Sequence, residues 1–485
     1  MASGAAWALA RKWGARVSGV VTVAVLARAL DPADFGLVAL AVAFVAVLSV
    51  LVDFGVSTYV IQADEATDEV LDSCFWVGLG LGVLLAMLLF LSAPLAARAL
   101  DQPKLTDVLR VLSVVVIVNS LSSVQGALLS RQLRFRALAA RFLISNAVGS
   151  VVAVSLALNG AGVWALVAQQ VCSSTVGLLL LWRASAWRPG RRVRRESIRT
   201  IYAYGARVTS TSIVGQVEAQ GLTFLIGGTL GASALGFFSI AGKLSGIFLD
   251  LSLHVLGAAS LPVFAKYRAV PAVLIRGYLK AVDLTSLLAG STLALLAATC
   301  PVLLPLAFGE QWRPAVPVAV AMSAGSVVHC FTYLTRPLLL VKGREGVVLK
   351  IAILDAVLAL VMCFALLPFG LVAVVAARSV LSVVVAVALA VAVVRYGPVP
   401  VRSLMLVYLR NLTVILMVGL TSWGLLTLTL GQGLTRVPAL LLAVAAGAVA
   451  GAVGALLLRS PVVGEVKRTI SMVARRSRGT ADATV

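Results

Sequence analysis

Apolar runs of 18 or more residues recur from one end of this 485-residue chain to the other. Each run is long enough to cross the ~30 Å hydrocarbon core of a bilayer as an α-helix. Only 12% of the residues are charged, against roughly 25% in soluble globular proteins. This composition excludes a water-soluble fold, and the sequence lacks the short alternating strands typical of a membrane β-barrel. The sequence therefore predicts an all-α, polytopic membrane protein.

The number of apolar runs predicts about fourteen transmembrane helices. Three basic residues precede the first run, but no convincing cleavage site follows it, so we interpret this run as a span and not as a signal peptide. The expected spans lie near residues 14–30, 35–61, 73–100, 107–130, 142–158, 162–182, 201–228, 233–262, 281–308, 315–341, 347–367, 370–394, 411–430 and 437–458.

The basic residues indicate how the chain crosses the membrane. If the N-terminus is cytoplasmic, 31 of the 40 Lys and Arg residues fall on the cytoplasmic side and three lie within spans. The other side holds Arg28, Arg98, Lys104, Arg110, Arg313 and Arg436. This asymmetry follows the positive-inside rule, predicts that both termini are cytoplasmic, and explains the net charge of +21 without a nucleic-acid partner.

The longest basic connection divides the expected spans into two groups of six. We therefore expect a lobe over 1–182, a cytoplasmic linker over 183–199, a second lobe over 200–394, two further spans over 395–458, and a cytoplasmic tail over 459–485. A weak internal repeat supports this division, because Leu30, Gly36 and Ala41 recur in order as Leu230, Gly236 and Ala241. Repeats six spans apart have the same orientation, which is typical of transporters that rock about a central site.

Several segments resemble the polysaccharide-transporter family of oligosaccharide flippases, within the multidrug/oligosaccharidyl-lipid/polysaccharide exporter superfamily. They are Leu26 to Gly36 (LARALDPADFG), Asp53 to Ser57 (DFGVS), Arg131 to Arg136 (RQLRFR), Gly160 to Val167 (GAGVWALV) and Phe308 to Trp312 (FGEQW). The resemblance extends to about residue 395, and the last two spans match only in hydrophobicity.

The resemblance implies two six-helix lobes that form a V around a central cavity, in a bacterial cytoplasmic membrane. It also implies a polyprenyl-diphosphate-linked oligosaccharide as substrate, carried from the cytoplasmic to the outer leaflet. The implied partners are this substrate, membrane lipids and other polysaccharide-assembly proteins. No cofactor is expected.

Cations inside the membrane are the candidates for binding the diphosphate, since an unpaired phosphate is costly to desolvate. The candidate substrate-binding residues are Arg28, Arg207, Lys243 and Arg378. The alternative is structural: Lys243 could pair with Asp250, and the arginines could anchor or cap helix ends.

Carboxylates and a histidine within the spans are the candidates for coupling to a proton or sodium ion. They are Asp53, Glu218, Asp250 and His254, and Lys243, Asp250 and His254 share one helical face by their spacing of seven and four. These groups could instead balance a neighbouring cation or hydrogen-bond between helices.

Two other functions compete with the flippase. A drug or organic-cation antiporter of the same superfamily should have a cavity dominated by carboxylates and aromatic rings, whereas the candidate residues here are largely basic. A membrane polymerase or ligase would need a catalytic group, and the sequence offers two histidines, no metal-ligand cluster and no nucleophile motif. We therefore expect no catalytic residues, no bound metal and no enzymatic activity.

Overall fold

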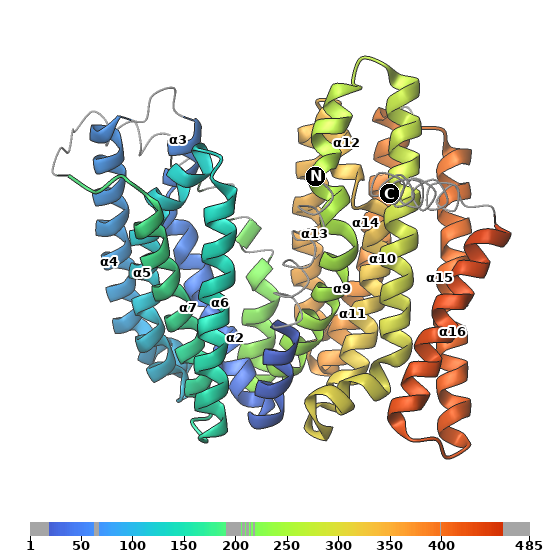
Figure 1. Cartoon of the computed structure of the whole chain (residues 1–485), viewed down its shortest axis with the longest axis horizontal. Coiled ribbons are helices and arrows are strands. Elements are labelled where there is room, and N and C mark those ends of the chain that lie inside the picture. The colour runs from blue at the N-terminus through green and yellow to red at the C-terminus, as the bar shows by residue number, and fades with distance from the viewer. Residues whose placement is uncertain are drawn as a thin grey trace, which may run out of the picture. The chain divides into compact units, whose positions relative to one another are not determined.

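The computed structural model describes residues 19–62, 67–190, 205, 209, 213, 215–216, 219–397 and 399–458, with backbone only for 250–259 and 261–262. The described part is almost entirely helical (Figure 1). Its longer helices are α2 (Pro32–Asp53), α4 (Asp68–Ala99), α5 (Leu105–Arg131), α6 (Phe135–Leu158), α7 (Val163–Ala184), α9 (Gly231–Lys266), α10 (Pro271–Phe308), α11 (Ala315–Thr332), α13 (Glu345–Leu366), α14 (Leu371–Tyr396), α15 (Val401–Gly431) and α16 (Arg436–Leu457). Short helices are α3 (Val56–Gln62), η1 (Glu310–Trp312), α12 (Thr335–Val341) and η2 (Leu367–Phe369).

The prediction of an all-α polytopic membrane protein is confirmed. Among the described residues, 12 helices are long and apolar enough to cross a membrane, and a shorter apolar helix covers Gly19–Ala29. Large apolar side chains point outward along these helices, as on α4, where Leu91 is 63% and Leu95 71% exposed. Two of the fourteen expected spans, 14–30 and 201–228, lie partly outside the described residues, so the count of fourteen stays a prediction.

The chain divides into two compact units, one up to Ser239 and one from Ile240 onward. In the first unit α5 is central, because α2, α4 and α7 all pack against it, and α6 pairs with α7. In the second unit α10 packs against α11, α15 and α16, and α14 packs against α11 and α13. The expected division at the basic segment 183–199 stays a prediction, since most of that segment is not described.

The expected single helix over 35–61 is wrong, because the helix breaks after Asp53. Phe54 and Gly55 adopt left-handed backbone conformations with φ of 39° and 72°. A left-handed residue cannot continue a right-handed helix, and glycine accepts this conformation at little cost. The chain resumes as α3 at Val56. The expected helix over 315–341 is also interrupted, at Tyr333 and Leu334 between α11 and α12, but both residues keep right-handed backbone conformations.

Two helices begin about ten residues earlier than their apolar runs suggest. We expected spans from 281 and 411, whereas α10 begins at Pro271 and α15 at Val401. At 1.5 Å per residue, the 38 residues of α10 span about 57 Å. This is longer than the hydrocarbon core, so α10 projects beyond it.

Two glycines of the internal repeat lie against each other's helix in the first unit. A Cβ atom on Gly36 would lie 1.7 Å from the carbonyl oxygen of Ala232, and one on Gly236 would lie 1.9 Å from that of Pro32. The beginnings of α2 and α9 therefore cross backbone against backbone. The contact is reciprocal, since Pro32 and Gly36 correspond to Ala232 and Gly236 in the repeat.

Candidate functional site

Lys243 lies on the membrane-spanning helix α9, and its side chain is exposed. Its neighbours on α9 make the helix contacts instead. A Cβ on Gly242 would lie 3.4 Å from the Cε of Met322, and the hydroxyls of Ser245 and Ser323 lie 3.4 Å apart. Because Gly242 and Ser245 face α11, the lysine points to another side of α9. The exposed Lys243 side chain is therefore a candidate for contact with a ligand at membrane depth.

The structure does not show the other two residues that we expected on the same face of α9 as Lys243. The side chains of Asp250 and His254 lie outside the described residues, so their position relative to Lys243 stays a prediction. Arg207 and Glu218 also lie outside the described part of the chain. Arg28 is described, and its exposed side chain occupies the last turn of the helix Gly19–Ala29.

Arg378 on α14 is paired with a carboxylate of the second unit. Its Nη2 donates a hydrogen bond to Oδ2 of Asp355 on α13 at 3.3 Å, and its Nη1 lies 3.3 Å from Oδ1. The second approach is an ion pair without hydrogen-bond geometry, so Oδ1 has no hydrogen-bond partner. Asp355 is 4% exposed, whereas 34% of the Arg378 side chain is exposed. The carboxylate is thus neutralised while one side of the guanidinium remains accessible.

A histidine lies near this pair. His329, in the last turn of α11, is within electrostatic range of Arg336, Arg378 and Asp355. Its ring also packs edge-on against Tyr333, with centroids 5.9 Å apart. His329 is thus within electrostatic range of the Arg378–Asp355 pair, and Arg336 of α12 is within range of His329. The two arginines, Arg336 and Arg378, exceed the single carboxylate Asp355, which favours an anion in this part of the second unit.

Asp53 lies at the break between α2 and α3. The hydroxyl and the backbone N–H of Ser57 both donate hydrogen bonds to its carboxylate. Asp53 thus caps the first turn of α3, which has free N–H groups. The side chain is half-buried, so this candidate coupling residue already has a structural role.

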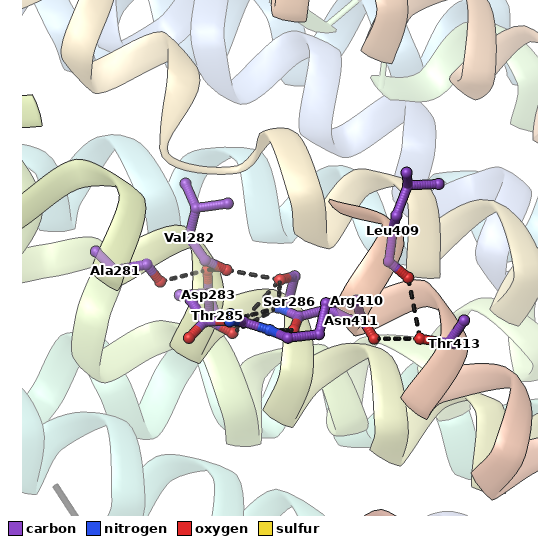
Figure 2. Close-up of polar contacts among 9 residues, drawn as sticks. All are labelled: Ala281, Val282, Asp283, Thr285, Ser286, Leu409, Arg410, Asn411 and Thr413. Atoms are coloured by element: carbon purple, nitrogen blue, oxygen red, sulfur yellow. Dashed lines mark hydrogen bonds and ion pairs between the residues drawn. The ribbon is translucent and has the colours of Figure 1, made fainter. Parts of the chain in front are cut away.

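A buried polar cluster between α10 and α15 was missed by the sequence analysis (Figure 2). Asp283 of α10 forms an ion pair with Arg410 of α15 and accepts a hydrogen bond from Asn411 Nδ2 at 2.9 Å. The same amide donates to the Ser286 hydroxyl at 2.8 Å and to the Asp283 carbonyl at 3.0 Å. Asp283 is 1% exposed and Asn411 0%.

The only sequence signals for this cluster are the polar residues themselves. Asp283 and Ser286 are three residues apart and so share a helical face, and Arg410 directly precedes Asn411. Both pairs lie near the expected starts of spans, where polar residues are common and do not by themselves indicate a buried cluster. The cluster fixes the α15–α16 hairpin to α10 and is fully satisfied, which favours a structural role.

A cavity of about 380 Å³ opens at one end of the first unit, where α2, α5 and α7 begin. Asp31, Asp34, Asp107, Lys104 and Trp164 line it. Two of the segments that carry the family resemblance, Leu26 to Gly36 and Gly160 to Val167, meet here. The acidic residues lie at helix N-termini, where carboxylates stabilise the helix dipole. Among the described residues, no group of three or more His, Cys, Asp or Glu side chains could hold a metal ion.

Comparison with known proteins gives the same family as the sequence segments. The succinoglycan biosynthesis transport protein ExoT of Rhizobium meliloti (strain 1021) is 29% identical over 354 residues, which cover 72% of this chain and 71% of ExoT. The lipopolysaccharide biosynthesis protein WzxC of Escherichia coli (strain K12) is 25% identical over 339 residues, which cover 68% of each chain.

Solved structures show the same fold. The lipid II flippase MurJ in an inward closed conformation superposes with a TM-score of 0.75, at 11% identity, over 93% of this chain and 98% of MurJ. An inward-facing multidrug resistance MATE family transporter of the MOP superfamily superposes with a TM-score of 0.64, at 15% identity, over 79% of this chain and 95% of that chain. The profile of the polysaccharide biosynthesis protein family matches residues 25–317. Since this match covers more than half of the sequence, the chain belongs to the polysaccharide biosynthesis protein family.

Proposed function

We propose that this protein is a flippase that moves a polyprenyl-diphosphate-linked oligosaccharide from the cytoplasmic to the outer leaflet of the bacterial cytoplasmic membrane. The oligosaccharide passes through the protein by alternating access while the polyprenyl tail stays in lipid. No bond is made or broken, so the protein is a transporter and not an enzyme. Both termini face the cytoplasm.

The exposed Lys243 carries this proposal. A lysine in a membrane-spanning helix costs free energy unless water, a counter-charge or an anionic ligand contacts its ammonium group. Lys243 does not lie in the interface between α9 and α11, where Gly242 and Ser245 make the contacts. A diphosphate is the anion that a polysaccharide-precursor transporter must desolvate, and an accessible ammonium group offsets that cost.

The basic residues near Asp355 support an anionic substrate. Arg378 and Arg336 give this part of the second unit an excess of cationic groups over Asp355. An organic-cation antiporter would need the opposite balance. We assign Lys243 and Arg378 to diphosphate binding, with Arg28 and Arg207 as further contacts. Asp53, Glu218, Asp250 and His254 remain the proposed ion-coupling residues.

The test is translocation of a fluorescent polyprenyl-diphosphate oligosaccharide in proteoliposomes. We expect the native protein to transport it and Lys243→Ala to lose at least tenfold in rate. The matched control is Lys266→Ala, which removes an exposed lysine from the last turn of the same helix and should keep the native rate. Absence of transport by the native protein, together with proton-driven export of a cationic dye, would replace the flippase by the antiporter.

A further inference from the structure

The turn between α5 and α6 exposes basic and apolar side chains side by side. Leu133 has a left-handed backbone with φ of 55°, an unfavourable conformation for a residue with a branched side chain. Its side chain is 70% exposed, and that of Phe135 is 61% exposed. Arg134 and Arg136 alternate with them and are also exposed. The turn thus presents large apolar groups between arginines instead of burying them.

The segment that follows α7 is fixed to the same end of the first unit. Nη1 of Arg134 donates to the carbonyl of Ala184 at 2.8 Å, which joins the α5–α6 turn to the end of α7. Further on, the N–H of Gly190 donates to Asp72 Oδ1 at 2.8 Å, and Trp76 Nε1 donates to the Gly190 carbonyl at 2.8 Å. Both partners lie in the first turns of α4, so residues 185–190 lie across the end of the unit.

Aromatic rings underlie this fixed segment. Phe75 contacts Trp182 and Trp187 edge-on, with centroids 6.3 and 6.0 Å apart. The guanidinium of Arg188 lies 5.8 Å from the Trp182 ring centroid, while its Nη1 donates to the carbonyls of Ser185 and Trp187. Tryptophan and arginine gather at the level of lipid headgroups, where one part of each side chain is apolar and the other is polar.

We propose that this end of the first unit is a binding surface for anionic phospholipid headgroups. The surface, here called the basic patch, consists of Arg134, Arg136, Arg183 and Arg188 with Leu133 and Phe135 beside them. Its arginines bind the phosphate groups, and its two apolar side chains insert among the upper acyl chains. A water-soluble phosphate would use the arginines but would leave Leu133 and Phe135 in water.

The charge balance of the described residues fits this occupant. Arg136 and Arg183 are exposed and form no hydrogen bond or ion pair within the described part of the chain. Of the carboxylates at this end, Asp72 is 2% exposed and bonded to Gly190. Asp68 and Glu69 lie in the first turn of α4, where the helix dipole stabilises them. The arginines Arg136 and Arg183 of the basic patch are therefore available to bind an anionic partner.

The experiment measures lipid enrichment at the basic patch itself. Bimane is attached to Leu133→Cys in a Cys172→Ser background, since the other four cysteines are buried. The protein is placed in vesicles with phosphatidylglycerol or phosphatidylcholine brominated on the acyl chains. We expect brominated phosphatidylglycerol to quench more strongly at equal mole fraction. Each arginine near the surface should contribute about fivefold to this preference, the equivalent of about 1 kcal/mol.

The variants separate this proposal from a general effect of charge. Arg136→Gln combined with Arg183→Gln should lower the preference about 25-fold, the product of two fivefold contributions, whereas the two lysine substitutions should retain it and report that the fold is intact. Arg98→Gln, at the other end of α4 in the same unit, is the matched control and should not alter it. Equal quenching by the two lipids, equal loss in Arg98→Gln, or displacement of phosphatidylglycerol by an equimolar polyprenyl phosphate would overturn the proposal.

Discussion

Arg378 and Asp355 join α14 to α13 through two contacts of 3.3 Å, one a hydrogen bond and one an ion pair. The carboxylate is buried and the guanidinium is partly exposed. Arg378 can therefore both neutralise Asp355 and bind a substrate phosphate. Substituting Asp355 together with Arg378 distinguishes these two roles.

We predict that Arg378→Gln lowers both thermal stability and transport. The substitution leaves the buried Asp355 carboxylate unpaired. Removing one partner costs about 3–5 kcal/mol in a fully buried pair, and we expect roughly half of that here because the guanidinium is partly exposed to solvent. Adding Asp355→Asn should restore the thermal unfolding midpoint, because the unpaired charge is gone. Transport should stay low if Arg378 binds the diphosphate. Recovery of transport in the double variant would assign Arg378 a structural role alone.

We predict that Asn411→Leu destabilises the second unit and loosens the α15–α16 hairpin. The substitution leaves Asp283 and Ser286 without their amide partner in a buried site, at a cost of about 1–3 kcal/mol. The measurement is the thermal unfolding midpoint, with limited proteolysis of the connection between α14 and α15. Thr413→Val is the matched control, since Thr413 is exposed on the same helix and its hydroxyl bonds only to the α15 carbonyls of Leu409 and Arg410. An unchanged midpoint in Asn411→Leu would show that the cluster does not hold the hairpin.

The sequence predicted the membrane fold and the cationic candidates because apolar length and charge are local properties. It located Lys243 within a span, but its exposure depends on which face of α9 packs against α11. It also selected Arg378, yet the pairing with Asp355 arises only when α13 and α14 lie side by side. Which face of a helix is exposed and which side chains pair are tertiary properties, and sequence periodicity alone cannot predict them.

The errors of the sequence analysis have a common physical cause. Apolarity marks where a helix enters hydrocarbon, not where its hydrogen bonding begins. The expected spans therefore began ten residues late at α10 and α15, so Asp283 and Arg410 lie within two residues of the expected starts of spans, although they are interior to their helices. The break at Phe54 was not predicted, because apolar residues continue on both sides of it and composition does not reveal a left-handed backbone.

We predict that the pair of Glu310 and Arg436 contributes to stability only above the acidic range. Hydrogen bonding from Arg436 is the main cause that lowers the pKa of Glu310 from its ordinary value of 4.5. A carboxyl whose folded pKa is depressed contributes stability that is present above the unfolded pKa and is lost as pH falls through the folded pKa. Both side chains are more than half exposed, so the effect is small.

The measurement compares the thermal unfolding midpoints of the native protein and Arg436→Gln from pH 7 to pH 3. The native advantage should be constant down to about pH 5 and should vanish as Glu310 becomes protonated. It should also shrink in 0.5 M salt, because exposed charges are screened. A difference that persists at pH 3 would mean that Arg436 acts through packing and not through Glu310.

The reciprocal glycine contact yields the last prediction. Gly36→Ala or Gly236→Ala should each lower the thermal unfolding midpoint, because the added Cβ would overlap a backbone carbonyl that no rotamer change can move. Overpacking of this kind costs about 1–3 kcal/mol. The control is Gly80→Ala on α4, where a Cβ meets nothing within 4 Å and alanine should be neutral or stabilising by up to about 1 kcal/mol.

The two substitutions should also be coupled. Once one alanine has forced α2 and α9 apart, the second finds space already made, so the double variant should lose less than the sum of the single losses. Sites that share one contact depart from additivity by about 0.5–3 kcal/mol, whereas distant sites add within about 0.5 kcal/mol. Strict additivity would show that the two glycines do not face each other across one crossing.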